Sequence, residues 1–240
     1  MSAAPYDGGA PGAGGLNLGF STGDAPHVVA ENRRRALALT HARNAAWLEQ
    51  IHGTQVEDAH AVIKARKRRA YARGRERDGS GGRRLRRDDG RLPARALLRR
   101  RRPRDRRRAC GLANGIVEKT GERVAALAGV PASGLNAYLG PAIGPEAFEV
   151  GEDVLEAFAV ATPASRRDAT VAAFRPAGGA PAKYFADIYA LARLRLAGLG
   201  VDAARIHGGT HCTVTEKARF YSYRRDRVTG RMAAMIWLAD

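Results

Sequence analysis

Cysteine and long apolar runs are scarce in this sequence, and each scarcity excludes a class of protein. The two cysteines, Cys110 and Cys212, are too few for a disulfide framework, which favours a reducing compartment. No stretch approaches the roughly 18 consecutive apolar residues that a membrane-spanning helix needs. Residues 1–15 have neither a basic start nor an apolar core, so they do not read as a secretory signal. We therefore expect a cytoplasmic protein without a membrane partner.

The charge of the chain is confined to one internal segment, Lys64 to Arg108. This segment has 22 Lys and Arg against 5 Asp and Glu, whereas the rest of the chain has 19 of each, out of totals of 41 and 24. It contains a single aromatic residue, Tyr71, and its few leucines stand between arginine runs. Low hydrophobicity combined with high net charge predicts disorder, so residues 64–108 are expected to be a basic, disordered segment inside an otherwise neutral protein.

The rest of the sequence is typical of one domain of the mixed α/β class, residues 1–240. A hydrophobic content of 45% supports a core, and helical and extended patterns alternate along the chain. Asp24 is expected to cap the first helix, with Pro26 in its first turn. A second helix is expected over 112–130, and a third presents Tyr184, Ile188 and Leu191 with Leu194 on one face. The expected strands are 45–51, 135–139, 204–207 and 232–238.

The first candidate for chemistry is His52, at the expected end of a strand and directly before Gly53. A neutral imidazole ligates metals or acts as a base, and a strand end followed by glycine presents it in a fixed direction. An isolated histidine is also compatible with a structural or simply exposed side chain.

The second candidate is the segment from Gly208 to Thr213, which contains His211 and Cys212. Its glycines allow close approach of the backbone, and both side chains are possible metal ligands. Adjacent residues on a strand point to opposite faces, however, so a packed Cys212 is the favoured interpretation.

The third candidate is Arg219 to Asp226, where arginines alternate with aromatic residues. Arg224 and Arg225 could hold an anionic or planar substrate. The favoured alternative is a structural strand in which Arg225 pairs with Asp226 or another carboxylate.

Taken in order, several segments together resemble the bacterial laccase-domain family. The segments are Leu16-Asn17-Leu18-Gly19, Gly23-Asp24, Asn32-Arg33, Trp47 to Gly53, Gly140-Pro141-Ala142-Ile143-Gly144, Cys212-Thr213 and Phe220 to Asp226. Members of this family are called multicopper polyphenol oxidases in older naming and purine nucleoside phosphorylases in newer naming. The resemblance covers roughly residues 4–56 and 111–240.

The resemblance implies a single α/β domain and a zinc-dependent enzyme, described as a copper protein in the older literature of the family. The implied reaction is phosphorolysis of purine nucleosides with phosphate, on adenosine, inosine and methylthioadenosine, with adenosine deaminase side activity. The implied metal is held by His, Cys and His. Residues Gln50-Ile51-His52-Gly53 match the segment of the first ligand, so His52 inherits the metal and catalytic role.

The other two metal ligands that the family requires are absent from this sequence. They belong to a Thr-Ala-Asp-Cys-Leu-Pro-Val-Leu segment and a His-Ala-Gly-Trp-Arg-Gly segment, and the basic segment stands where both are expected. Cys110 is an unlikely substitute, because it lies in an unrelated context. As written, the chain is expected to bind zinc weakly and to be impaired or inactive as an enzyme.

The genetic code suggests how the cysteine ligand was lost, whereas the histidine segment is not recovered cleanly in the same way. Arg86 to Arg99 can be back-translated and read one base later to give Ala-Val-Met-Thr-Ala-Asp-Cys-Leu-Pro-Val-Leu-Phe-Cys, which contains the cysteine segment of the family. Our hypothesis is a frameshift that begins between Val56 and Lys67 and ends near Cys110. We also expect that the start of the chain is truncated, because Met1 to Tyr6 resembles the interior of a family segment.

A different class of function stays open, that of a nucleic-acid-binding protein that uses residues 64–108. An arginine-rich arm binds phosphates without sequence preference, with an affinity that falls steeply with salt. Such arms usually lie at termini or contain interleaved aromatic residues, which argues mildly against this function as the main one.

Overall fold

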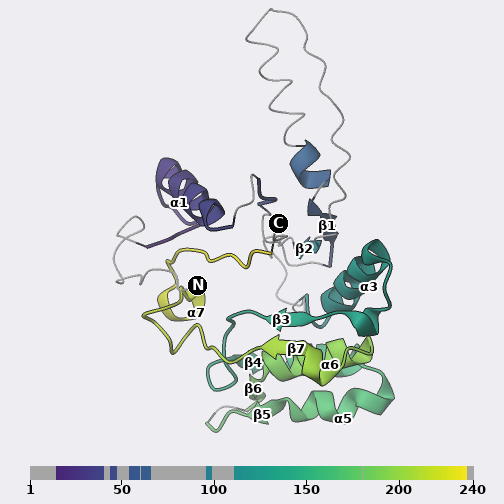
Figure 1. Ribbon diagram of the computed structural model, residues 1–240. Coiled ribbons are helices and arrows are strands. Elements are labelled where there is room, and N and C mark those ends of the chain that lie inside the picture. The colour runs from purple at the N-terminus through teal and green to yellow at the C-terminus, as the bar shows by residue number, and fades with distance from the viewer. Residues whose placement is uncertain are drawn as a thin grey trace, which may run out of the picture.

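The computed structural model describes residues 15–40, 44–47, 54–59, 61–65, 96–98, 111–179 and 181–236, with residues 96–98 described by their backbone. Short helices and strands alternate along the chain, so the α/β class is confirmed (Figure 1). The helices are α1 (Pro26–Ala38), α3 (Ile116–Ala128), α4 (Glu152–Val160), α5 (Ala164–Ala172), α6 (Ile188–Gly198), α7 (Tyr223–Asp226), and the 3₁₀ turns η1 (Ala132–Gly134) and η2 (Ala203–Arg205). The strands are β1 (Val56–Asp58), β2 (Ala96–Leu98), β3 (Ala137–Leu139), β4 (Glu149–Gly151), β5 (Phe174–Pro176), β6 (Lys183–Ala186) and β7 (Ile206–Gly208).

The strands form three small sheets. β3 and β7 are parallel, with Tyr138 opposite His207, and β4, β6 and β5 form an antiparallel sheet in that order. β1 pairs antiparallel with β2, which lies inside the basic segment. The remainder of residues 66–110 lies outside the described residues, so the expected disorder of this segment stays a prediction.

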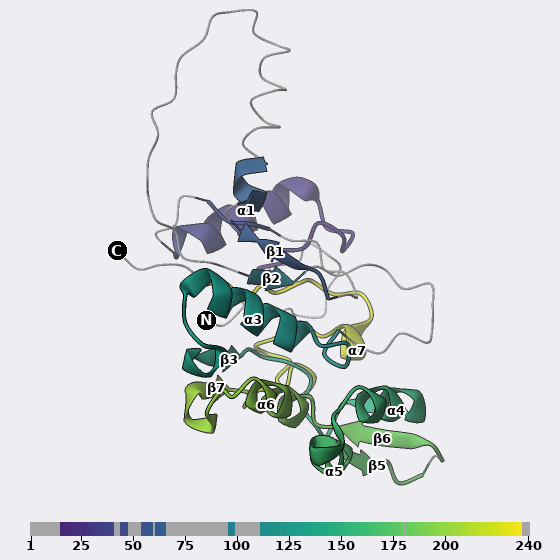
Figure 2. The same ribbon diagram turned by 90° about the vertical axis from the view of Figure 1, so that its right-hand side faces the viewer.

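Helix α6 joins the β3–β7 pair to the β4–β6–β5 sheet, because it contributes to both hydrophobic clusters. Leu191 packs with Phe158 and Phe174 against the β4–β6–β5 sheet, beside which α4 and α5 lie in Figure 2. Leu196 packs with Ile206 under the β3–β7 pair, where α3 also contributes. Phe158 is 1% exposed, and burial of such a side chain contributes about 1.5–3 kcal/mol.

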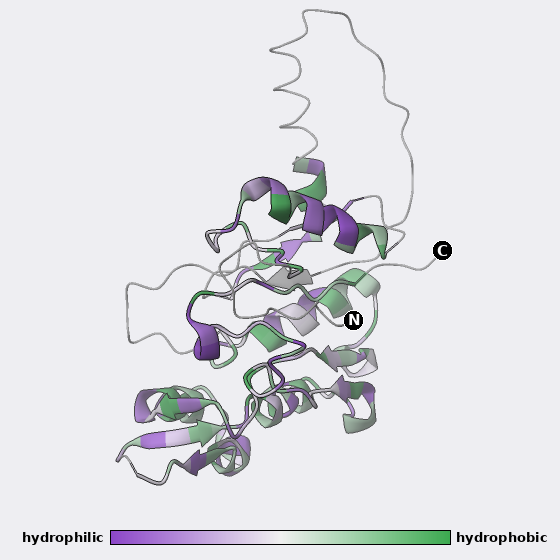
Figure 3. Cartoon of the chain, turned by 90° about the vertical axis from the view of Figure 1, so that its left-hand side faces the viewer, coloured by the Kyte–Doolittle hydropathy of each residue, from purple (hydrophilic) through white to green (hydrophobic). Residues whose placement is uncertain are grey.

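A buried polar network attaches α1 to the C-terminal part of the chain. The Asn17 side chain accepts from the Arg231 backbone N–H at 2.9 Å and donates to Asp24 at 3.0 Å. The side-chain amide of Asn32, on α1, donates to the Asn17 carbonyl at 3.1 Å. These residues carry the first family segments, so their role here is structural. Figure 3 shows α1 as largely hydrophilic, which explains why polar bonds rather than a wide apolar face hold it.

Several sequence predictions about elements are wrong in detail. Ala25, not Asp24, is the N-cap of α1, because the Asp24 carboxylate is bonded to Asn17 and to the Ala25 N–H. Tyr184 lies on β6, because its backbone pairs with β4 and β5 and the following helix begins only after Asp187. β3 is half exposed rather than buried, since Tyr138 is 72% exposed.

Two expected strands find no support in the part of the chain that is described. Residues 45–47 and 232–236 are irregular there, while 48–51 and 237–238 lie outside it. The backbone of Arg231 instead bonds to the N-terminal segment: its N–H donates to the Asn17 side chain, and its carbonyl accepts from the Leu18 N–H. These bonds take the place of pairing between strands. Among the described residues, no helix is both long and apolar enough to cross a membrane.

Candidate functional site

Two loops begin at the same end of the parallel β3–β7 pair. β3 runs into the Gly140–Gly144 loop and β7 into the segment from Gly209 to Glu216. A backbone bridge joins Ala142 to Cys212, and the Thr213 N–H donates to the Ala142 carbonyl at 2.8 Å. The carboxyl ends of parallel strands are where α/β proteins usually bind ligands, so these loops form the candidate site.

Tyr189, on α6, holds the two loops together through its phenolic oxygen. This oxygen accepts from the Ala142 N–H at 2.7 Å and donates to the His211 carbonyl at 2.6 Å. Burial raises the pKa of Tyr189, against the bond from Ala142, which lowers it. The hydroxyl therefore keeps its proton at neutral pH and serves as donor and acceptor at once.

Cys212 packs beside Gly144, as the favoured interpretation of its segment predicted. Its Sγ accepts from the Gly144 N–H at 3.2 Å, and a Cβ on Gly144 would stand only 3.1 Å from that sulfur. Burial acts to raise the pKa of the Cys212 thiol, but hydrogen bonds from Thr215, Gly144 and Val214 outweigh it and lower the pKa. The result is a half-buried sulfur whose ionised form is favoured by hydrogen-bond donors around it.

His211 is paired with Glu216. Its Nδ1 lies 3.1 Å from a Glu216 carboxylate oxygen, and Arg219 lies 2.9 Å from the same carboxylate. The bond from the Cys212 N–H, followed by His211 and Arg219, lowers the pKa of Glu216 despite partial desolvation. A carboxylate held ionised in this way fixes the orientation of the imidazole, whose side chain is 31% exposed.

The Arg219 to Asp226 segment bends around this site, and the prediction of a strand there is wrong. Ser222 caps the short helix α7, which turns the chain. The predicted pairing of Arg225 with Asp226 is confirmed, at 2.7 Å, and the Arg225 guanidinium also donates to the carbonyls of Thr213 and Phe220. The Arg225 guanidinium is therefore used in bonds that stabilise the loop.

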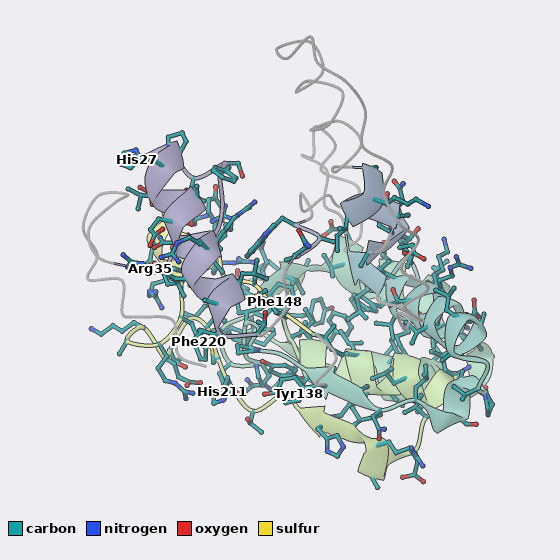
Figure 4. All side chains as sticks on the ribbon, turned by 45° about the horizontal axis from the view of Figure 1, so that its top comes forward. His27, Arg35, Tyr138, Phe148, His211 and Phe220 are labelled. Atoms are coloured by element: carbon teal, nitrogen blue, oxygen red, sulfur yellow. The ribbon has the colours of Figure 1, made fainter. Side chains whose placement is uncertain are left out.

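Arg224 differs from its neighbour because it is exposed. Its guanidinium lies over the Phe148 ring, 5.8 Å from the centroid, in the turn that follows Gly144. Figure 4 shows Phe148, His211 and Phe220 in the same part of the molecule. Of the two arginines proposed from the sequence, Arg224 is the one whose charge faces solvent beside the candidate site.

The remaining residues predicted from the sequence, His52 and Cys110, lie outside the described residues. Within the described ranges, no three His, Cys, Asp or Glu side chains come together as a metal site. Sequence reasoning missed Tyr189 and Glu216. Tyr189 contacts loops that are distant in the sequence, and the contacts of Glu216 form only when its own loop folds. A tyrosine two residues after the capping Asp187 was the only available signal.

Comparison with known proteins points to one family. The chain matches the family described as multi-copper polyphenol oxidoreductase laccase over residues 1–83 and 109–239. A purine nucleoside phosphorylase of Pseudomonas aeruginosa is 41% identical over 100% of this chain and 90% of its own length. The purine nucleoside phosphorylase YfiH of Escherichia coli is 43% identical over 99% of this chain and 89% of its own length.

Solved structures agree with this assignment of the fold. A crystal structure of a Neisseria meningitidis protein is 31% identical, with a TM-score of 0.65 over 96% of this chain and 87% of that protein. The structure of YlmD from Geobacillus stearothermophilus is 20% identical, with a TM-score of 0.62 over 90% of this chain and 82% of that protein. The match at lower identity bears on the fold alone.

Proposed function

The chain belongs to the multi-copper polyphenol oxidoreductase laccase family, and on that premise we propose that its function is that of a purine nucleoside phosphorylase. The observation that carries the proposal is the name shared by relatives that are 41% and 43% identical over nearly the whole chain. The proposed substrates are phosphate and purine nucleosides such as adenosine, inosine and methylthioadenosine, with deamination of adenosine as a side activity. A cytoplasmic location stays a prediction.

The candidate site supports this reaction with an anion-binding group and an oriented imidazole. In phosphorolysis, a phosphate oxygen replaces the purine nitrogen on the sugar carbon, and the departing purine takes up a proton. The exposed Arg224 guanidinium is suited to holding phosphate. His211, fixed by Glu216, is suited to moving the proton. Arg225 stabilises the loop on which Arg224 stands.

Zinc, which the family resemblance implies, does not fit the residues at hand. The sequence retains one of three expected ligands, His52, and the described residues bring no three metal-binding side chains together. His211 is bonded to Glu216, and the Cys212 sulfur faces the Gly144 N–H. His52 remains the proposed metal ligand and catalytic residue, but we derive no step through a metal ion. We propose that the chain as written is impaired for this reason.

The experiment compares this chain with a restored chain, in which residues 64–108 are replaced by a segment that carries both missing family motifs, Thr-Ala-Asp-Cys-Leu-Pro-Val-Leu and His-Ala-Gly-Trp-Arg-Gly. Each protein is incubated with phosphate and either adenosine or inosine, and free purine and ribose 1-phosphate are measured. We expect the restored chain to be at least roughly 100-fold faster, because lost support of a metal site alone costs 10- to 100-fold. His52→Ala in the restored chain should return the rate to that of the chain as written.

Two results would contradict different parts of this proposal. A restored chain that is folded and releases no purine would overturn the phosphorylase function. Equal rates for the two chains would retain the function but overturn the impairment and the frameshift hypothesis on which it rests.

A second candidate function, nonspecific nucleic-acid binding, is favoured by the charge of residues 64–108. With 22 basic and 5 acidic residues in that segment, we expect binding to mixed-sequence RNA that weakens steeply between about 50 and 200 mM salt. Fluorescence anisotropy measures this affinity, and the restored chain serves as the control. An affinity that does not change with salt would exclude an electrostatic arm.

A further inference from the structure

Tyr138 is an aromatic side chain on a strand that the fold leaves open to solvent. It is the middle residue of β3 and is 72% exposed, although β3 packs its other face against the core through Ala137 and Leu139. In a parallel pair, residues in register lie on the same face, and the partner of Tyr138 on β7 is the exposed His207. The outer face of the pair therefore presents an aromatic ring beside an imidazole.

The Tyr138 ring is braced on one side by the backbone of β7. A Cβ on Gly208 would stand 3.0 and 3.2 Å from two ring atoms and against the Leu139 carbonyl oxygen. Glycine at position 208 is therefore the residue type that leaves room for the ring. Gly208 supports one side of the ring and restricts its orientation. A ligand that stacks on the ring therefore loses less conformational entropy of the protein than it would on a freely rotating side chain.

The ring also lies at the end of the pair where the candidate site is built. β3 continues directly into the Gly140–Gly144 loop, and two residues separate Gly208 from His211. The Gly209 N–H donates to the Leu139 carbonyl at 2.8 Å, so the two chains remain together as they leave the sheet. Figure 4 shows Tyr138 and His211 in the same part of the molecule, as this short connection requires.

We propose that Tyr138 is the platform on which the purine ring of the substrate stacks. The inference rests on the proposed function, since it assigns the base-binding residue of the same site. Every purine has a flat π-face, and stacking on an aromatic side chain is a large and sequence-tolerant source of affinity for bases. His207 is the register partner of Tyr138, and His211 lies four residues further along the same segment of the chain.

The test is purine binding by the full chain, measured by calorimetry with adenosine and with free hypoxanthine. Tyr138→Ala should weaken binding about tenfold, the loss expected for one base–aromatic stack. Tyr138→Phe should change it less than about threefold, because the ring is kept. Phe20→Ala, which removes an exposed aromatic ring outside the candidate site, is the matched control and should leave binding unchanged.

The outcomes separate this inference from the proposed function. If the chain binds purines and Tyr138→Ala binds them equally well, the platform is wrong and the function stands. If neither the unaltered chain nor the restored chain binds purine when folded, both are overturned. If Tyr138→Ala leaves purine affinity unchanged but abolishes a dimer seen by light scattering, this face is an interface between two copies and the inference is wrong.

Discussion

Single side chains determine how the candidate site is held. The Tyr189 hydroxyl contacts both site loops, at 2.7 Å from the Ala142 nitrogen and 2.6 Å from the His211 oxygen. Glu216 joins the Cys212 backbone to the His211 ring in the same way. These side chains therefore hold the loops together with the backbone bridge between Ala142 and Cys212, and changes at these positions act on geometry.

Gly208 is the residue at which a small change should cost most. Its φ of +73° is in the left-handed region, and a methyl group would press against the Leu139 carbonyl and the Tyr138 ring. We expect Gly208→Ala to lower the free energy of unfolding by about 1–3 kcal/mol. Gly178→Ala is the control, since a Cβ there meets nothing within 4 Å. Urea denaturation of both variants is the measurement, and equal stabilities would contradict the assigned strain.

The Cys212 thiol should react at lower pH than an ordinary cysteine. Its pKa is lowered by hydrogen bonds that outweigh burial, and the side chain of Thr215 makes one of them. Since the thiolate is the reactive form, Thr215→Val should raise the pKa and shift the pH midpoint of reaction with a disulfide reagent upward. The measurement uses a Cys110→Ser background, with Thr210→Val as the control. An unchanged midpoint in Thr215→Val would show that its bond does not stabilise the thiolate.

Among the elements, α6 is the one on which the others depend. It packs against the β3–β7 pair and the β4–β6–β5 sheet and carries Tyr189. Its start is defined by Asp187, whose carboxylate accepts from the Tyr189 and Ala190 N–H groups at 2.9 Å. Arg195, near its other end, donates to Glu118 of α3 at 3.1 Å. A loss at the cap should therefore weaken the whole arrangement around the site.

Asp187→Ala removes this cap. We expect it to lower the free energy of unfolding by about 1 kcal/mol, the usual cost of losing an N-cap carboxylate. Asp168→Ala, an exposed change inside α5, is the control and should have a smaller effect. Thermal unfolding followed by circular dichroism distinguishes them, and a larger loss in Asp168→Ala would be evidence against the cap.

The elements could be predicted from the sequence where local signals were strong. Pro26 and the breaker at Pro131 placed α1 and α3 to within a few residues, and Gly200 marked the end of α6. The strands were harder, because each described strand has three or four residues and its pairing depends on distant partners. Tyr184 was assigned to a helix because its spacing fits one, but pairing with β4 and β5 outweighed that pattern.

The candidate site could be predicted only in part, for the same reason. The pairing of Arg225 with Asp226 involves neighbours, so the sequence was enough to propose it. The contact between Tyr189 and the Ala142 N–H spans 47 positions and exists only once α6 lies under the loops. His52, the strongest site residue by resemblance, lies outside the described residues and stays a prediction.

At the scale of the whole molecule, the basic segment stands where the family fold requires other residues. The family match resumes at residue 109 after ending at 83, and the intervening stretch lies where the missing metal-binding segments are expected. The charge of +17 equals the excess of that segment alone. Our account is therefore a purine nucleoside phosphorylase whose flanking segments keep the fold and whose central segment has lost two metal ligands.

The zinc content of the purified full-length chain tests this account most directly. After dialysis, elemental analysis should find far less than stoichiometric zinc in the chain as written, since His52 alone cannot hold the ion tightly. The same analysis should find stoichiometric zinc in the restored chain, in which residues 64–108 are replaced by a segment that carries both missing family motifs. Tight, stoichiometric zinc in the chain as written would contradict the account, because the ligands would then have to come from residues to which we assign no such role.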